Sequence, residues 1–225
     1  MKRTKLKDRV LPTYSKGEEI FNMVTHIVGG GMGIITLIAG TIIAILHHSG
    51  YALFSIFLFA ASMIVLYTMS SIYHGLSPKK ETAKKVLQVL DHCTIFALIA
   101  GSYTPFALCS FRNYDSYLGW GIFTLIWGFG ILGIVLNSID LKKYKVFSMI
   151  CYLVMGWCII FKASLLPQLL SVPGTVLLVL GGIFYTIGAI FYGLGRTKKW
   201  MHSIFHLFIL FGNLMHILCI LIYVI

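Results

Sequence analysis

Long apolar stretches alternate with short polar ones along almost the whole chain. Each apolar stretch holds about 20 residues, which is the length that a helix needs to cross the hydrocarbon core of a bilayer. The polar segments between them are turns and loops that carry most of the charged residues. The pattern predicts an all-α integral membrane protein, a seven-transmembrane helix bundle with spans at about residues 21–46, 51–73, 86–109, 118–139, 146–166, 175–194 and 201–225.

The composition agrees with this pattern and excludes a large soluble domain. Of the 225 residues, 58% are hydrophobic and 11% are charged, whereas about 25% of the residues in a soluble domain are charged. We therefore divide the chain into a basic cytoplasmic N-terminal segment, 1–20, and a membrane domain, 21–225. The five cysteines contain no CxxC pair and lie in or beside apolar stretches, so we expect reduced core residues.

The basic residues are distributed unevenly between the two sides of the predicted bundle. Sixteen of the 18 Lys and Arg residues lie in the N-terminal segment and in the loops after the second, fourth and sixth spans; Arg112 and Lys162 lie on the other side. The positive-inside rule then predicts a cytoplasmic N-terminus and an external C-terminus. Basic loops facing the anionic inner leaflet account for the net charge of +11, with membrane lipids as partners and no nucleic acid.

The last span carries a polar stripe on an otherwise apolar helix. At about 100° per residue, His202, His206, Asn213 and His216 fall on one face. Ionisable groups inside a membrane segment are costly and usually mark a functional site. The i, i+4 spacing of His202 and His206 allows both imidazoles to bind one metal ion, and the alternative is a pair of hydrogen-bonded packing histidines.

Two other spans bring ionisable residues to the same depth. His74 ends the second span, Asp91 lies near the start of the third, and His202 and His206 begin the seventh, all within about 10 Å of the cytoplasmic face. Three neutral imidazoles leave the fourth position of a tetrahedral zinc ion open, which is the catalytic type of site. We therefore predict a zinc site formed by His74, His202 and His206.

Two further residues are candidates for catalysis. Ser70 lies one turn before His74 on the same face, so we expect it to hydrogen-bond a ligand or a bound water. The sequence His202-Ser-Ile-Phe-His206 lacks the glutamate of HExxH proteases, so the base must come from another helix. We assign that role to Asp91, as the only acidic residue expected inside the bundle; direct binding of the metal by Asp91 is the alternative.

Weaker signals come from the first and last spans. Glu18, Glu19 and His26 can approach the site from the first span, although acids also cap a helix N-terminus. His216 lies about 15 Å beyond His206, too far to share an ion, so we expect it to bond Asn213.

These residues resemble a known family. Ser70-x3-His74, Asp91 and His202-x3-His206 look like the three signature motifs of the hemolysin III proteins, within the progestin and adipoQ receptor family and a superfamily that includes alkaline ceramidases. Two more segments resemble the bacterial branch, Glu18-Glu19-x2-Asn22-x2-Thr25-His26 and Ala100-Gly-Ser-Tyr-Thr-Pro-Phe106. The resemblance implies a seven-helix bundle in the bacterial plasma membrane with a cytoplasm-facing zinc ion. The family name implies haemolysis, and the superfamily implies hydrolysis of lipid amides.

The sequence leaves four candidate functions for the chain. A zinc-dependent hydrolase acting on a lipid amide or ester uses both the convergent histidines and their interfacial depth. A pore-forming cytolysin needs no such histidines, and the chain lacks any sign of a switch from a soluble form. A metal or proton transporter usually binds near the midplane between inverted repeats, and we find no such repeat. A non-catalytic membrane regulator or receptor-like protein is the remaining alternative.

Overall fold

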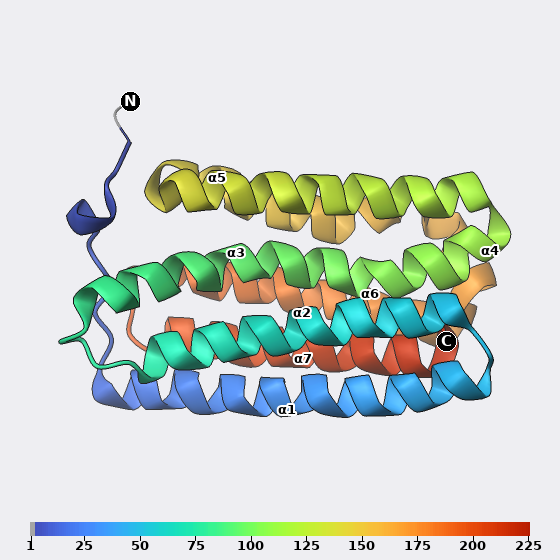
Figure 1. The fold of residues 1–225 in the computed structure, drawn as a ribbon, viewed down its shortest axis with the longest axis horizontal. Coiled ribbons are helices and arrows are strands. Elements are labelled where there is room, and N and C mark those ends of the chain that lie inside the picture. The colour runs from blue at the N-terminus through green and yellow to red at the C-terminus, as the bar shows by residue number, and fades with distance from the viewer. Residues whose placement is uncertain (1–2) are drawn as a thin grey trace.

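The chain forms a bundle of long helices that run along one axis. The computed structural model describes residues 3–225, which contain helices and connecting segments but no β-strand. Figure 1 shows the long helices side by side, with the N-terminal segment packed across one end of the bundle. The elements are η1 (Leu6–Asp8), α1 (Lys16–Leu46), α2 (Gly50–Gly75), α3 (Glu81–Pro105), η2 (Phe106–Phe111), α4 (Arg112–Tyr114), α5 (Ser116–Trp157), η3 (Cys158–Leu165), α6 (Leu166–Leu194) and α7 (Met201–Tyr223).

The number of separate long helices differs from the predicted seven. By length and composition, five helical segments of the described chain can cross a membrane. Four of them correspond to the predicted spans one, two, three and seven. The fifth is the stretch Ser116–Leu194, in which three predicted spans follow one another with helical turns in place of extended loops.

Helix α5 reverses direction within its 42 residues. The backbone leaves the helical conformation at Asp140, with φ −157° and ψ 92°. Beyond it, the Ser148 hydroxyl donates to Asn137 Oδ1 at 2.6 Å; in a straight helix, residues eleven positions apart would be separated by about 16 Å. Asp140 also caps the second half, because its carboxylate accepts the amides of Lys142 and Lys143. Figure 1 shows the turn beside the N-terminal segment.

The outside of the bundle is apolar, as expected for a protein surrounded by lipid. On α1 the exposed residues are mostly isoleucines and valines, whereas the buried face holds small and polar side chains. Helix α1 packs on α2, and a Cβ on Gly29 would approach the ring of Tyr67 to 2.5 Å, while one on Gly33 would approach Ile64 to 2.9 Å. Gly29 and Gly33, about one helical turn apart, therefore form a close-packing face of α1 against α2.

One end of the bundle gathers the starts of α1, α3 and α7 and the end of α2 (Figure 1). Ser15 and Glu18 form a capping box at the start of α1. The second oxygen of Glu18 accepts the amide of Trp200 at 2.6 Å. Trp200 has a φ of 65°, and this bond helps to hold its left-handed conformation directly before α7. The starts of α1 and α7 are thus joined at the level of the predicted site.

Candidate metal centre

The three predicted ligand histidines lie together at this end of the bundle. His74 comes from α2, and His202 and His206 come from the first two turns of α7. All three are buried, and one ring nitrogen of each lies within 4.8 Å of the others. The Nε2 atoms of His202 and His206 are 3.0 Å apart. We call these three residues the histidine group.

A carboxylate orients the first of these histidines. Glu19 Oε2, on α1, lies 2.6 Å from Nδ1 of His74. The other Glu19 oxygen accepts a bond from the ammonium group of Lys84, which is itself buried. Because an ionised carboxylate can only accept, Nδ1 of His74 carries the proton and Nε2 presents its lone pair to the other two histidines.

The unpaired atoms around the group fit a bound cation. Nε2 of His74 and Nδ1 of His206 are buried, with no hydrogen-bond partner among the described residues. Leaving a buried polar atom unpaired costs about 1–3 kcal/mol, so such atoms clustered in one place indicate a site built for something to bind. Three imidazoles with a carboxylate behind one of them form a donor set that zinc prefers.

Two more aromatic side chains enclose the group. The ring of Tyr14, in the N-terminal segment, stacks on His202 with centroids 4.9 Å apart. Burial raises the pKa of the Tyr14 phenol, so the side chain stays neutral at physiological pH. His26, on α1, stacks on His206 with centroids 3.8 Å apart, and neither of its ring nitrogens has a partner among the described residues. The weak signals at Glu19 and His26 thus correspond to residues beside the histidine group.

The two residues predicted to be catalytic lie near the group but outside it. Ser70 is buried one turn from His74, and its hydroxyl has no hydrogen-bond partner among the described residues. Asp91, on α3, is half-buried, with its carboxylate 3.8 Å from Nδ1 of His92. The expectation that Asp91 would be the only acid inside the bundle is wrong, because Glu18 and Asp140 are more deeply buried and Glu19 contacts His74.

The expected bond between His216 and Asn213 is also absent from the hydrogen bonds of the described chain. The amide of Asn213 donates to Tyr67 and accepts from Tyr185, whereas Nε2 of His216 lies 3.3 Å from the carbonyl oxygen of Leu178. Helical position predicted the shared face correctly, but the neighbouring helices supplied the better-placed partners.

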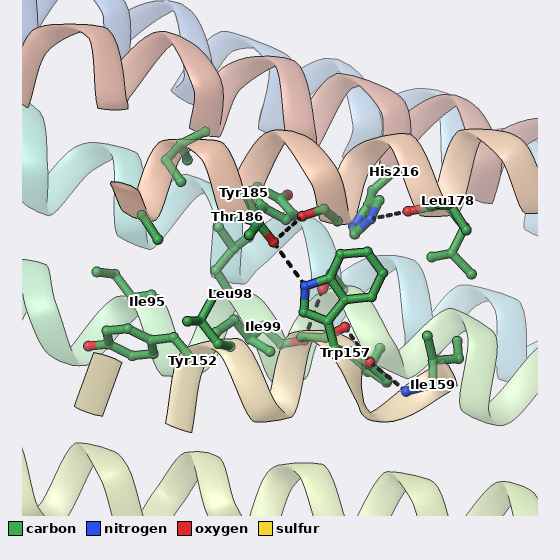
Figure 2. A pocket seen from close by; sticks show the side chains of 18 of the residues that line it. Ile95, Leu98, Ile99, Tyr152, Trp157, Ile159, Leu178, Tyr185, Thr186 and His216 are labelled. Atoms are coloured by element: carbon green, nitrogen blue, oxygen red, sulfur yellow. Dashed lines mark hydrogen bonds between the residues drawn. The ribbon is translucent and has the colours of Figure 1, made fainter. Parts of the chain in front are cut away.

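A mostly apolar cavity of about 340 Å³ extends from the histidine group into the bundle. Its wall contains Ser70, Asp91 and His206 at one end and His216 farther along α7. Figure 2 shows the middle of the cavity, where the Trp157 indole lies against it and donates to the Thr186 hydroxyl at 2.9 Å. We call this the apolar cavity. Its size and lining are typical of a site for a small apolar molecule or chain.

A second, more polar cavity of about 360 Å³ also borders the histidine group. Its walls come from the N-terminal segment, α3, the bend of α5 and the end of α6, together with His202. Asp91 and Tyr192 line both cavities. We call this the polar cavity.

Comparison with known proteins gives a consistent result. Residues 14–217 match the model of a family described as "Haemolysin-III related". The chain is 38% identical over 207 residues to a Bacillus cereus protein named "Hemolysin-3", an alignment that covers 92% of each chain. It is 36% identical over 206 residues to a Bacillus subtilis (strain 168) protein named "Hemolysin-3 homolog", with 92% of this chain and 94% of the relative aligned.

Proposed function

This chain belongs to the haemolysin III family of multi-pass cell membrane proteins, and we propose that it is a zinc-dependent hydrolase acting on an amide or ester bond of a membrane lipid. The observation that carries the proposal is the buried group of His74, His202 and His206, whose ring nitrogens converge beside a cavity suited to an acyl chain. We assign these three residues as the ligands of the ion. Bound there, zinc would polarise a carbonyl and lower the pKa of a water molecule.

The remaining residues supply orientation and proton transfer. Glu19 holds His74 with Nε2 directed toward the other two imidazoles. Ser70 and Asp91 line the apolar cavity with His206, which supports their assignment to the reaction. We infer that Asp91 takes up the proton of the attacking water and returns it to the leaving group. The Ser70 hydroxyl is free to hydrogen-bond that water or the lipid carbonyl.

We also propose seven membrane passes with a cytoplasmic N-terminus. A straight helix of the 42 residues of α5 would be about 63 Å long, twice the thickness of the hydrocarbon core. The bend at Asp140 divides α5 into two lengths that each fit a bilayer, and Lys142, Lys143 and Lys145 follow the bend. In this orientation the histidine group lies near the cytoplasmic surface, at the level of lipid carbonyls.

The names of the relatives favour a second function, since one is named "Hemolysin-3" and the other "Hemolysin-3 homolog". A pore that lyses cells has no need for three buried histidines with unpaired nitrogens, so we place hydrolysis first. A non-catalytic regulator would use the same site to bind a lipid without turnover.

Metal analysis of the detergent-purified protein tests the site. We expect about one zinc per chain, and loss of most of it in each of His74→Ala, His202→Ala and His206→Ala, because an open three-ligand site has no spare donor. His92→Ala and His216→Ala are the matched controls and should keep their zinc. If His74→Ala keeps full zinc while His216→Ala loses it, the site proposed here is wrong.

Two activity measurements separate the candidate functions. We expect vesicles containing the protein to accumulate free fatty acid from an added ceramide or phospholipid, detected by mass spectrometry, and His206→Ala to abolish this release. A dye-leakage assay on the same vesicles tests the pore. Leakage that persists in His206→Ala, with no lipid cleavage by either the wild type or the variant, would favour the pore over the hydrolase.

A further inference from the structure

The polar cavity contains more positive charge than the proposed reaction requires. Arg9, Lys142, Lys145 and Arg196 all line it, whereas Asp91 is the only acidic residue in its wall. None of the four cations forms an ion pair with a carboxylate within residues 3–225. Lys145 instead lies over the ring of Tyr192, with Nζ 5.4 Å from the ring centroid.

Arg9 is the most unusual of these residues. Its side chain is folded inward, so that the residue is only 8% exposed. Nε and Nη1 are both buried and have no hydrogen-bond partner among the described residues. A buried guanidinium without an anion is costly, and the cost is recovered only when a hydrogen-bonding anion binds.

The nearest candidate within the chain is already used by other groups. Asp140 is buried and close enough to Arg9 to act on it as an opposite charge. Its carboxylate oxygens, however, accept the amide of Thr4 at 2.7 Å and those of Lys142 and Lys143 at 3.1 Å, and none of them bonds Arg9. The other carboxylate of the cavity wall, Asp91, lies 3.8 Å from Nδ1 of His92 and forms no ion pair with any of the four cations. Among the described residues, no carboxylate therefore hydrogen-bonds Nε or Nη1 of Arg9.

We propose that the polar cavity binds the phosphate group of an anionic molecule, with Arg9 as the central contact and Lys145 and Arg196 beside it. A guanidinium offers two parallel N–H donors that match two phosphate oxygens, and the two further cations suit the second negative charge of a phosphate monoester. The binding of phosphate requires no metal. One part of the proposal rests on the proposed function. It is the placement of a phosphate-bearing lipid with its headgroup in the polar cavity and its chain in the apolar cavity, across the histidine group.

A binding experiment on the purified full-length protein tests this site. The probes are a fluorescent phosphatidic acid and the matching diacylglycerol, which lacks only the phosphate. Retention by the immobilised protein in detergent is measured with and without a zinc chelator. We expect phosphatidic acid to bind in both conditions and more tightly than diacylglycerol, and Arg9→Gln to weaken its binding about tenfold to a hundredfold.

The control variant is Lys7→Gln, which removes one positive charge from an exposed position of the same segment and should bind as the wild type does. Lys145→Gln, on a different element, should also weaken binding and serves if Arg9→Gln disturbs the N-terminal segment. Zinc content should be unchanged in both cavity variants. Loss of zinc only in the histidine variants, and loss of phosphatidic acid only in the cavity variants, would separate the two sites.

Inorganic phosphate distinguishes the source of the group. If millimolar phosphate displaces phosphatidic acid from the wild type, the site recognises phosphate alone; if it does not, while Arg9 is still required, the site recognises a lipid headgroup. Both results support the proposal. Equal retention of phosphatidic acid and diacylglycerol, or full retention by both Arg9→Gln and Lys145→Gln, would overturn it.

Discussion

The Glu19 carboxylate determines which nitrogen of His74 faces the other two imidazoles. The Nδ1 atom of His74 is 2.6 Å from Glu19 Oε2, and Lys84 holds the opposite oxygen. Such outer partners of ligand histidines contribute about tenfold to a hundredfold to metal affinity. We expect Glu19→Gln to weaken zinc binding by that factor, measured by competition with a coloured chelator, because a neutral amide is a weaker acceptor for the Nδ1 proton.

Glu81→Gln is the matched control for this change. Glu81 is exposed and pairs with Lys85 away from the histidine group. The zinc affinity of the Glu81→Gln variant should therefore equal that of the wild type. An unchanged affinity in Glu19→Gln would reduce Glu19 to an ion-pair partner of Lys84.

Asp91 is tested by a change that removes its charge and little else. Asp91→Asn should keep its zinc and lose at least a hundredfold in lipid hydrolysis, because general bases typically contribute 10²- to 10⁴-fold and an amide accepts no proton. Asp115→Asn, at the opposite end of the bundle, should keep full activity, since asparagine caps a helix about as well as aspartate. Loss of zinc in Asp91→Asn would instead make Asp91 a ligand.

The sequence predicted the histidine group and gave weak signals for Glu19 and His26, but it did not predict how these two residues contact the group. The helical rise fixes the depth of His74, His202 and His206 below the basic loops, so their shared level follows from residue numbers alone. Contact with Glu19 depends on the rotation of α1 relative to α2, which no periodicity within α1 determines. Tyr14 lies in a segment without a repeating pattern, and so it gave no signal.

At the level of elements, the contact between α1 and α2 depends on residues without side chains. A Cβ on Gly29 would approach the buried Tyr67 ring to 2.5 Å, and that ring cannot move without losing its bond to Asn213. We expect Gly29→Ala to destabilise the protein by about 1–3 kcal/mol and to lower its thermal unfolding midpoint in detergent. Gly31→Ala is the control, because nothing lies within 4 Å of its Cβ. Equal midpoints for the two variants would contradict this account of the contact.

Helix boundaries were predicted well where polar residues mark them, and less well where helices follow one another directly. Ser49 caps α2, because its hydroxyl accepts the amide of Ala52. Pro105 ends the regular part of α3 and is followed by the wide turns of η2. The bend at Asp140 shows no glycine or proline at its centre, and its signal was the change from apolar residues to lysines.

At the level of the whole molecule, the chemistry is concentrated at one end. The histidine group borders both the apolar cavity inside the bundle and the polar cavity, which is lined in part by the N-terminal segment. The other end contains short connections and the C-terminus (Figure 1). A lipid entering from the bilayer would therefore meet apolar walls first and positive charge last, which matches the order of chain, carbonyl and headgroup in a membrane leaflet.

The proposed topology can be tested by reporters placed within the longest helical stretch. Fusions to the two ends are not sufficient, because five passes and seven passes both put the termini on opposite sides. If α5 crosses the membrane and returns at Asp140, a fluorescent protein fused after Lys143 should fluoresce, because this reporter requires the cytoplasm. Alkaline phosphatase fused after Gln168 or Ile225 should be active, because this enzyme requires the exterior. The reason is the cluster of lysines after the bend, which the positive-inside rule keeps in the cytoplasm. A fusion after Glu81, in the most basic loop, provides the cytoplasmic reference.

The alternative is that Ser116–Leu194 crosses the membrane only once, inward. In that case, if Lys143 is cytoplasmic, no later position within this stretch could return to the exterior. Fluorescence at both Lys143 and Gln168 would thus exclude seven passes, and fluorescence at Ile225 would reverse the side on which the histidine group is placed.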